Sequence, residues 1–211
     1  MANTNGAFGL RPIGVVGQAA NTTGATEYRI AAGNTNAIFQ GSPVIPLAAG
    51  VIDRVGAAAG GTVGLLGVFW GCEYVSSTTG EKIFANNWPG SGADSNHPVK
   101  AFVYDNPMQT FVICSDASLT SAATAQGTVF ANANFADGAA GNSTTGISSA
   151  KLGVSTIATT ANLNLRIMGI QDDPDNSDFT AAGIPVIVRL NNSFNSANGA
   201  IAGGTVSTTG V

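Results

Sequence analysis

The sequence predicts an all-β protein, folded as a small antiparallel barrel or sandwich with either one β body or two β subdomains. Many short stretches alternate apolar and polar residues with a period of two, and turns rich in glycine separate them. Only 9% of the 211 residues are charged, which disfavours long surface helices stabilised by Glu–Lys pairs. The length suits a single β domain or a barrel with a smaller β appendage.

The aromatic stretch 67–90 is the hairpin around which the rest of the chain is expected to pack. Residues 67–75 alternate, residues 76–80 predict a turn, and residues 83–84 resume the strand pattern. Burying one tryptophan removes on the order of 150–250 Å² from water, which favours folding by roughly 4–6 kcal/mol before entropy is counted. We therefore expect the core to form on the rings of Trp70, Tyr74 and Trp88.

The chain divides into an extended N-terminal arm (1–26), a β body (27–192) and a flexible C-terminal tail (193–211). The arm is rich in Asn, Thr, Gly and Ala with isolated apolar residues, so it cannot bury enough area to order by itself. It is expected to order only against the body or a neighbour. Its expected anchor consists of Phe8, Leu10, Arg11 and Pro12.

Within the body, alternation and turn residues predict short strands in sequence order. The run 40–47 contains Pro43 and Pro46, which lack a backbone donor and so place it at a sheet edge or barrel rim. Residues 99–104 and 110–114 predict a second hairpin with its turn at 105–107. Residues 163–168 and 184–190 predict a terminal antiparallel pair, whereas 117–127 allows one helical turn. Further strands are expected at 27–30, 37–39, 51–55, 63–66 and 130–135.

The sequence contains no recognisable catalytic constellation, so we expect the protein not to be an enzyme and to need no cofactor. His97 is the only histidine, and no Gly-x-Ser-x-Gly motif is present. Cys72 and Cys114 offer no metal-ligand spacing, and buried free thiols are favoured over a disulfide between them.

One acidic run is a weak calcium candidate, because carboxylate oxygens at close spacing are suitable ligands. The run lacks the glycine and the terminal glutamate of an EF-hand loop, so a solvated connection between two strands is favoured. Its carboxylates belong to Asp172, Asp173, Asp175 and Asp178.

Charge and composition point to protein partners. The net charge of −4 and the pI near 4.6 provide no field that would attract nucleic acid or an anionic membrane. We see no signal peptide and no apolar run long enough to span a bilayer, so synthesis in a cytoplasm is expected. A weakly polar surface with few charges is tolerated when a partner covers it.

Several stretches in a fixed order resemble the head-decoration, or cement, proteins of tailed bacteriophages, in particular those of phages that infect marine and freshwater bacteria. None of these stretches is a chemical signature alone, and their order carries the resemblance. The stretches are residues 1–12, Gly67 to Cys72 through Trp88-Pro89-Gly90, Val103 to Pro107 with Phe111, 163–175, and 186–192.

The resemblance implies a structural virion protein on the outer surface of the capsid, made in the host cytoplasm. Such a protein would be a homotrimer that clamps neighbouring subunits of the major capsid protein, and it would have no catalytic residues. An alternative is a glycan-binding or adhesion module on the phage surface, because aromatic rings such as Trp70, Tyr74 and Trp88 can stack on sugars. A tail or fibre subunit is a third alternative, but no internal repeat of fixed period is present.

Overall fold

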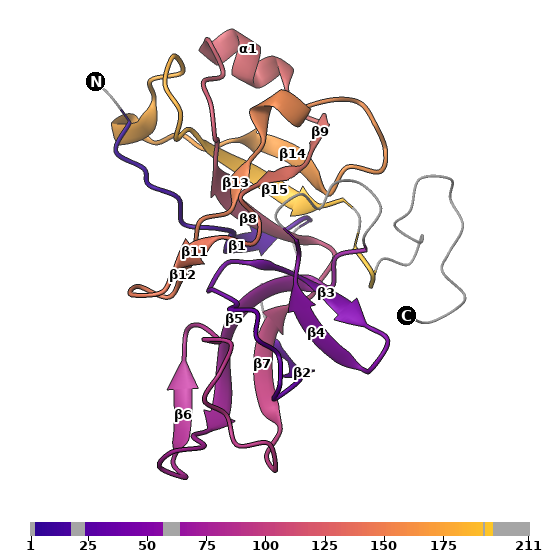
Figure 1. Ribbon diagram of the computed structural model, residues 1–211. Coiled ribbons are helices and arrows are strands. Elements are labelled where there is room, and N and C mark those ends of the chain that lie inside the picture. Colours follow the sequence, from indigo (N-terminus) through magenta and orange to yellow (C-terminus); the bar gives the residue numbers. More distant parts are fainter. Residues whose placement is uncertain (1–2, 18–23, 57–63, 192, 196–211) are drawn as a thin grey trace.

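The computed structural model describes residues 3–17, 24–56, 64–191 and 193–195. Of the described residues, 42% are strand and 7% helix, and the sheets are antiparallel, which confirms the all-β prediction. The arrangement is a sandwich, and the described strands do not close into a barrel. Figure 1 shows a five-stranded sheet with a short helix at one end of the molecule and a six-stranded sheet at the other end.

The five-stranded sheet has the order β1-β8-β15-β14-β9, and every neighbouring pair is antiparallel. The pairing of β14 with β15 confirms the predicted terminal pair. A helix, α1 (Ala122–Gly127), packs beside β14 and confirms the predicted helical turn. The strands are β1 (Arg11–Val15), β8 (Gln109–Cys114), β9 (Asn132–Ala133), β14 (Leu165–Ile170) and β15 (Pro185–Leu190).

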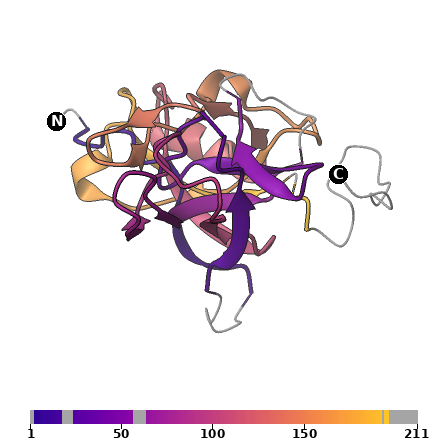
Figure 2. The ribbon, with the colours of Figure 1, turned by 60° about the horizontal axis from the view of Figure 1, so that its bottom comes forward.

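The six-stranded sheet has the order β2-β7-β5-β3-β4, with β6 paired to β5. The pairing of β5 with β6 confirms the hairpin predicted over 67–90. Figure 2, in which the end of the molecule with this sheet comes forward, shows it in front of the five-stranded sheet. The strands are β2 (Thr26–Ile30), β3 (Pro43–Leu47), β4 (Val51–Arg54), β5 (Gly67–Val75), β6 (Lys82–Ala85) and β7 (Val99–Tyr104).

Short elements complete the fold. Two small antiparallel pairs are β10 (Phe135–Ala136) with β13 (Lys151–Leu152), and β11 (Gly141–Asn142) with β12 (Ile147–Ser148). Two single-turn 3₁₀ helices are η1 (Val154–Thr156) and η2 (Pro174–Asn176).

The hairpin predicted over 99–114 is wrong. β7 is already paired on both sides, with β2 and β5, so no edge remains for β8. The turn carries the chain into the other sheet instead, where β8 lies between β1 and β15. The Asn106 side chain stabilises this turn by accepting a hydrogen bond from the Met108 N–H at 2.9 Å.

The buried apolar residues form two clusters. The cluster of the five-stranded sheet contains Phe111, Ile113 and Val188, and it also includes Leu65 and Val68 from the other half of the chain. Because Val68 belongs to β5 of the six-stranded sheet, this cluster packs the two sheets against each other. The second cluster lies on the six-stranded sheet around Ile38, Phe69, Trp88, Val99 and Val103.

Only part of the expected aromatic core is buried. Trp88 is fully buried, and the Tyr74 ring packs edge-on against it, with 5.4 Å between the ring centres. Trp70 is only half-buried, because the pairing of β5 with β7 shifts by one residue between Phe69 and Gly71. This bulge interrupts the alternation, so Phe69 takes the core position. The Trp70 ring packs edge-on against the Tyr104 ring, with 5.4 Å between the ring centres.

The described part of the predicted arm (1–26) packs on the body, which is one of the two surfaces against which the arm is expected to order. Residues 11–15 form the edge strand β1, and Leu10 is fully buried in the core. Gly9 allows this close packing with φ +68°, because a Cβ there would lie 2.7 Å from the Gly41 carbonyl oxygen. At the other end, Ser193 forms a parallel bridge with Leu65, and residues 196–211 of the predicted tail lie outside the described residues.

Candidate functional site

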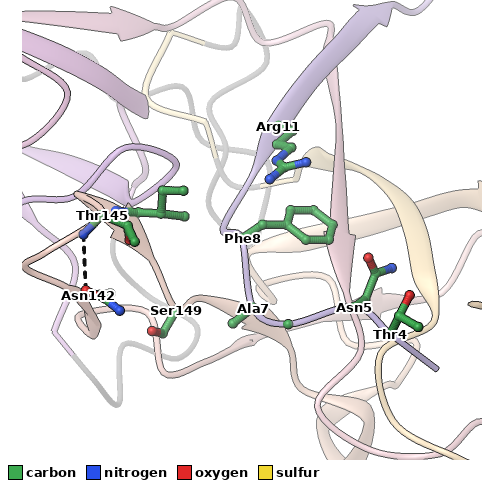
Figure 3. A pocket seen from close by; sticks show the side chains of 10 residues that line it. Thr4, Asn5, Ala7, Phe8, Arg11, Asn142, Thr145 and Ser149 are labelled. Carbon is green, nitrogen blue, oxygen red and sulfur yellow. Dashed lines mark hydrogen bonds between the residues drawn. The ribbon is translucent and has the colours of Figure 1, made fainter. Parts of the chain in front are cut away.

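An open depression of about 470 Å³ lies between the N-terminal segment and the β11–β12 hairpin. Figure 3 shows Phe8 and Arg11 on one side, with Asn142 and Thr145 across from them. Most of the lining side chains are short and polar, with apolar groups from Ala7, Phe8 and Ile147. The lining comprises residues 4–8, Arg11, Asn142, Thr145, Ile147 and Ser149.

The Arg11 guanidinium lies 4.4 Å from the centre of the Phe8 ring. Such a contact contributes about 0.5–1 kcal/mol at an exposed site. No Asp or Glu side chain of the chain forms an ion pair with Arg11, and all twelve of them are described. The Arg11 side chain therefore covers one face of Phe8 and keeps donors for another acceptor.

A smaller cavity of about 30 Å³ adjoins the depression and brings Trp70 close to Phe8 and Arg11. Three residues that the sequence assigns to the arm or to the core therefore meet at one surface. The sequence does not predict the opposite wall, the β11–β12 hairpin, because residues 141–148 show no apolar alternation.

The other two predicted anchor residues lie elsewhere. Leu10 is 0% exposed and belongs to the chain's own core, so the prediction that it anchors the protein to a neighbour is wrong. Pro12 is half-buried and lies opposite Phe111 in the β1–β8 pair. The physical reason is that β1 forms the edge of the five-stranded sheet, and its pairing with β8 places the side chain of the preceding residue, Leu10, in the core.

The Asp-rich loop 171–184 binds the N-terminal segment through hydrogen bonds. The Asn176 Oδ1 accepts hydrogen bonds from the Thr4 and Asn5 N–H groups at 2.8 and 2.7 Å. The Asn3 Nδ2 donates to the Ala182 carbonyl oxygen at 2.7 Å, and its Oδ1 accepts from the Asp178 N–H at 3.0 Å. These contacts fix the position of Thr4 and Asn5, which line the depression.

Two of the aspartates considered as calcium ligands, Asp173 and Asp178, accept hydrogen bonds from within this loop. Asp173 accepts from the Asp175 N–H at 3.1 Å and from the Asn176 Nδ2 at 2.8 Å. Hydrogen bonds from Thr180 hold the pKa of Asp178 below its usual value. Within the described ranges, no group of three or more His, Cys, Asp or Glu side chains could hold a metal ion.

Chelation is expected to leave the stability unchanged, because Asp172, Asp173, Asp175 and Asp178 do not form a ligand set. The measurement is the thermal midpoint of the purified protein before and after treatment with EDTA. A fall in the midpoint that added Ca²⁺ reverses would reinstate a calcium site.

Asn176→Ala is expected to release the N-terminal segment, because Asn176 is 5% exposed and its side chain bonds two backbone N–H groups of that segment. Leaving these donors unsatisfied should lower the free energy of unfolding by about 1–3 kcal/mol. Hydrogen–deuterium exchange should accelerate at Thr4 and Asn5. Ser177→Ala, at an exposed position of the same loop, is the control. Equal exchange in both variants would refute the role of Asn176 in holding the N-terminal segment.

The described residues do not form a catalytic centre around His97. Its Nδ1 lies 3.0 Å from the Asp94 Oδ2 on an exposed loop, and no serine or cysteine side chain is among its described contacts. The backbone N–H of Asn96, followed by the His97 ring, holds the pKa of Asp94 below its usual value. The pair therefore stabilises the local turn.

Both cysteines are free and buried, as the sequence analysis favours. Burial raises the pKa of Cys72 to about 12 and also raises that of Cys114. Because the thiolate is the reactive form, neither cysteine should react with Ellman's reagent in the native protein at pH 8, and both should react in denaturant. Rapid reaction of one thiol without denaturant would contradict the burial of that side chain.

Comparison of the chain with protein-family models, curated proteins and solved structures found no match. The described part of the chain contains no helix that is both long enough and apolar enough to cross a membrane.

Proposed function

We propose that this protein is a structural virion protein that binds the outer surface of a phage capsid. It stabilises the shell by clamping neighbouring major capsid subunits, and it acts as a homotrimer. It is not an enzyme. The proposal rests on the resemblance in sequence order and on a surface suited to a protein partner.

The observation that carries the proposal is the edge strand β1. It pairs with β8 on one side only, so within the described residues its other edge has no strand partner. Ile13 on this strand is 49% exposed, and Met108, whose carbonyl accepts from the Val16 N–H, is 43% exposed. An open edge with apolar side chains can add a strand from a neighbouring protein.

The proposal is tested by co-sedimentation with expanded, undecorated phage capsids over a concentration series. We expect saturable binding at a fixed ratio to capsid subunits and rupture of the decorated shells at higher temperature. Ile13→Glu should weaken binding, because it adds a charge to the contact strand. Leu47→Glu, at a position with 38% exposure on β3, is the matched control. Absence of saturable binding would refute the proposal.

A glycan-binding module is the second candidate, favoured by the polar depression next to Phe8 and Trp70. It is the weaker candidate, because Arg11 covers one face of Phe8 and Trp70 packs edge-on against Tyr104. A glycan screen with the wild type and Arg11→Ala tests it. Binding of a saccharide that the variant loses, together with no capsid binding, would favour this candidate.

A further inference from the structure

Two arginines lie side by side on the five-stranded sheet. Arg166 of β14 is directly opposite Arg189 of β15, and Arg189 is opposite Thr110 of β8. The residues that flank the two arginines in their strands, among them Ile167 and Val188, are buried. Because side chains alternate along a strand, both arginines project from the face opposite the core.

No acidic side chain of the chain neutralises this pair. The four ion pairs involve Lys82, His97, Lys100 and Lys151, and all twelve Asp and Glu residues are in the described ranges. Like charges that face each other across two strands destabilise a sheet. The isolated protein therefore carries an uncompensated repulsion at this position.

The hydrogen bonds of the pair leave donors free. The Arg166 Nε donates to the Asn132 Oδ1 at 3.1 Å. Among the described residues, the Arg189 Nη1 reaches only the Met108 Sδ at 3.5 Å, and the buried Nε of Arg189 has no hydrogen-bond partner. Sulfur is a weak acceptor, so the Arg189 guanidinium is poorly satisfied. Burial, followed by the charge of Arg166, lowers the pKa of Arg189, in agreement with a cation that lacks a counter-charge.

We propose that the Arg166–Arg189 pair binds a carboxylate that a partner protein presents to this face of the sheet. Two guanidinium groups offer paired N–H donors in the planar geometry that a carboxylate accepts, and the anion would remove the repulsion between them. The neighbouring side chains of Met108, Met168 and Ile187 are apolar and partly exposed, which suits a protein surface. The partner rests on the proposed function, in which it is a capsid subunit.

The site itself is tested without capsids by following the arginine Nε–Hε signals in NMR spectra during titration with acetate. We expect saturable shifts of the Arg166 and Arg189 signals and no shift for Arg29, an exposed arginine of β2 that has no ion-pair partner in the described ranges. Equal shifts at Arg29, or no shift at the pair, would overturn the site. In a parallel titration with inorganic phosphate, shifts that acetate fails to produce would overturn the assignment to carboxylate.

The partner is tested with the double variant Arg166→Gln and Arg189→Gln. We expect capsid binding to fall roughly tenfold or more, while the thermal midpoint of the free protein stays equal or rises. Arg29→Gln should bind as the wild type does. Loss of stability in the double variant, or unchanged capsid binding, would overturn the proposal. If the wild type itself does not bind capsids, the proposed function fails, and the acetate titration still judges the anion site.

Discussion

Trp88→Ala is expected to lower the free energy of unfolding by about 3–5 kcal/mol. Trp88 is 0% exposed and is among the largest fully buried side chains. Its Nε1 donates to the Asn34 carbonyl oxygen at 3.2 Å, and its backbone exchanges two hydrogen bonds with Ile38. Alanine would leave a cavity beside Tyr74 and an acceptor without its donor. Urea unfolding followed by circular dichroism measures the change.

Trp70→Ala is the matched control, since Trp70 is the chain's second tryptophan and is only half-buried. Its loss should cost less than about 2 kcal/mol, because fewer contacts are removed and less cavity remains. Quenching by iodide should likewise reach Trp70 more easily than Trp88. If the two substitutions had equal effects, the bulge would not place the two rings in different environments.

The strands could be predicted from the sequence because alternation reports locally which side of a strand is buried. The β14–β15 pair and the β5–β6 hairpin could be predicted in this way. The bulge at Trp70 was not, since one extra residue changes the pairing with β7 without changing the local composition. The position of β8 also depended on a non-local fact, namely that both edges of β7 are occupied.

The candidate site was harder to predict from the sequence, because the residues that form it are distant along the chain. Asn176 binds the Thr4 N–H across 172 positions, and an Asp-rich run gives no sign of that partner. Arg166 and Arg189 look like ordinary polar positions on solvent-facing strand sides. Their juxtaposition follows from the register of β14 and β15, which the pattern of each strand alone does not define.

Leu10→Ala is expected to lower the free energy of unfolding by about 2–5 kcal/mol. Leu10 is fully buried in the cluster that contains Phe111 and Ile113, and its N–H donates to the Gly41 carbonyl oxygen at 3.0 Å. The close crossing at Gly9 leaves little room for the segment to shift and fill a cavity. Urea unfolding measures the loss, and a change below about 1 kcal/mol would show that the segment does not belong to the core.

Phe8→Ala separates attachment from folding, which deletion of residues 2–12 cannot do. The deletion is expected to unfold or strongly destabilise the protein, because it removes Leu10 and the first two residues of β1. Phe8 is half-buried beside the depression and carries the Arg11 contact, so its loss should cost about 1 kcal/mol or less. Weaker capsid binding by Phe8→Ala at nearly unchanged stability would assign the depression to the interface. Unchanged binding would instead leave β1 and the sheet face of Arg166 and Arg189 as the contact surface.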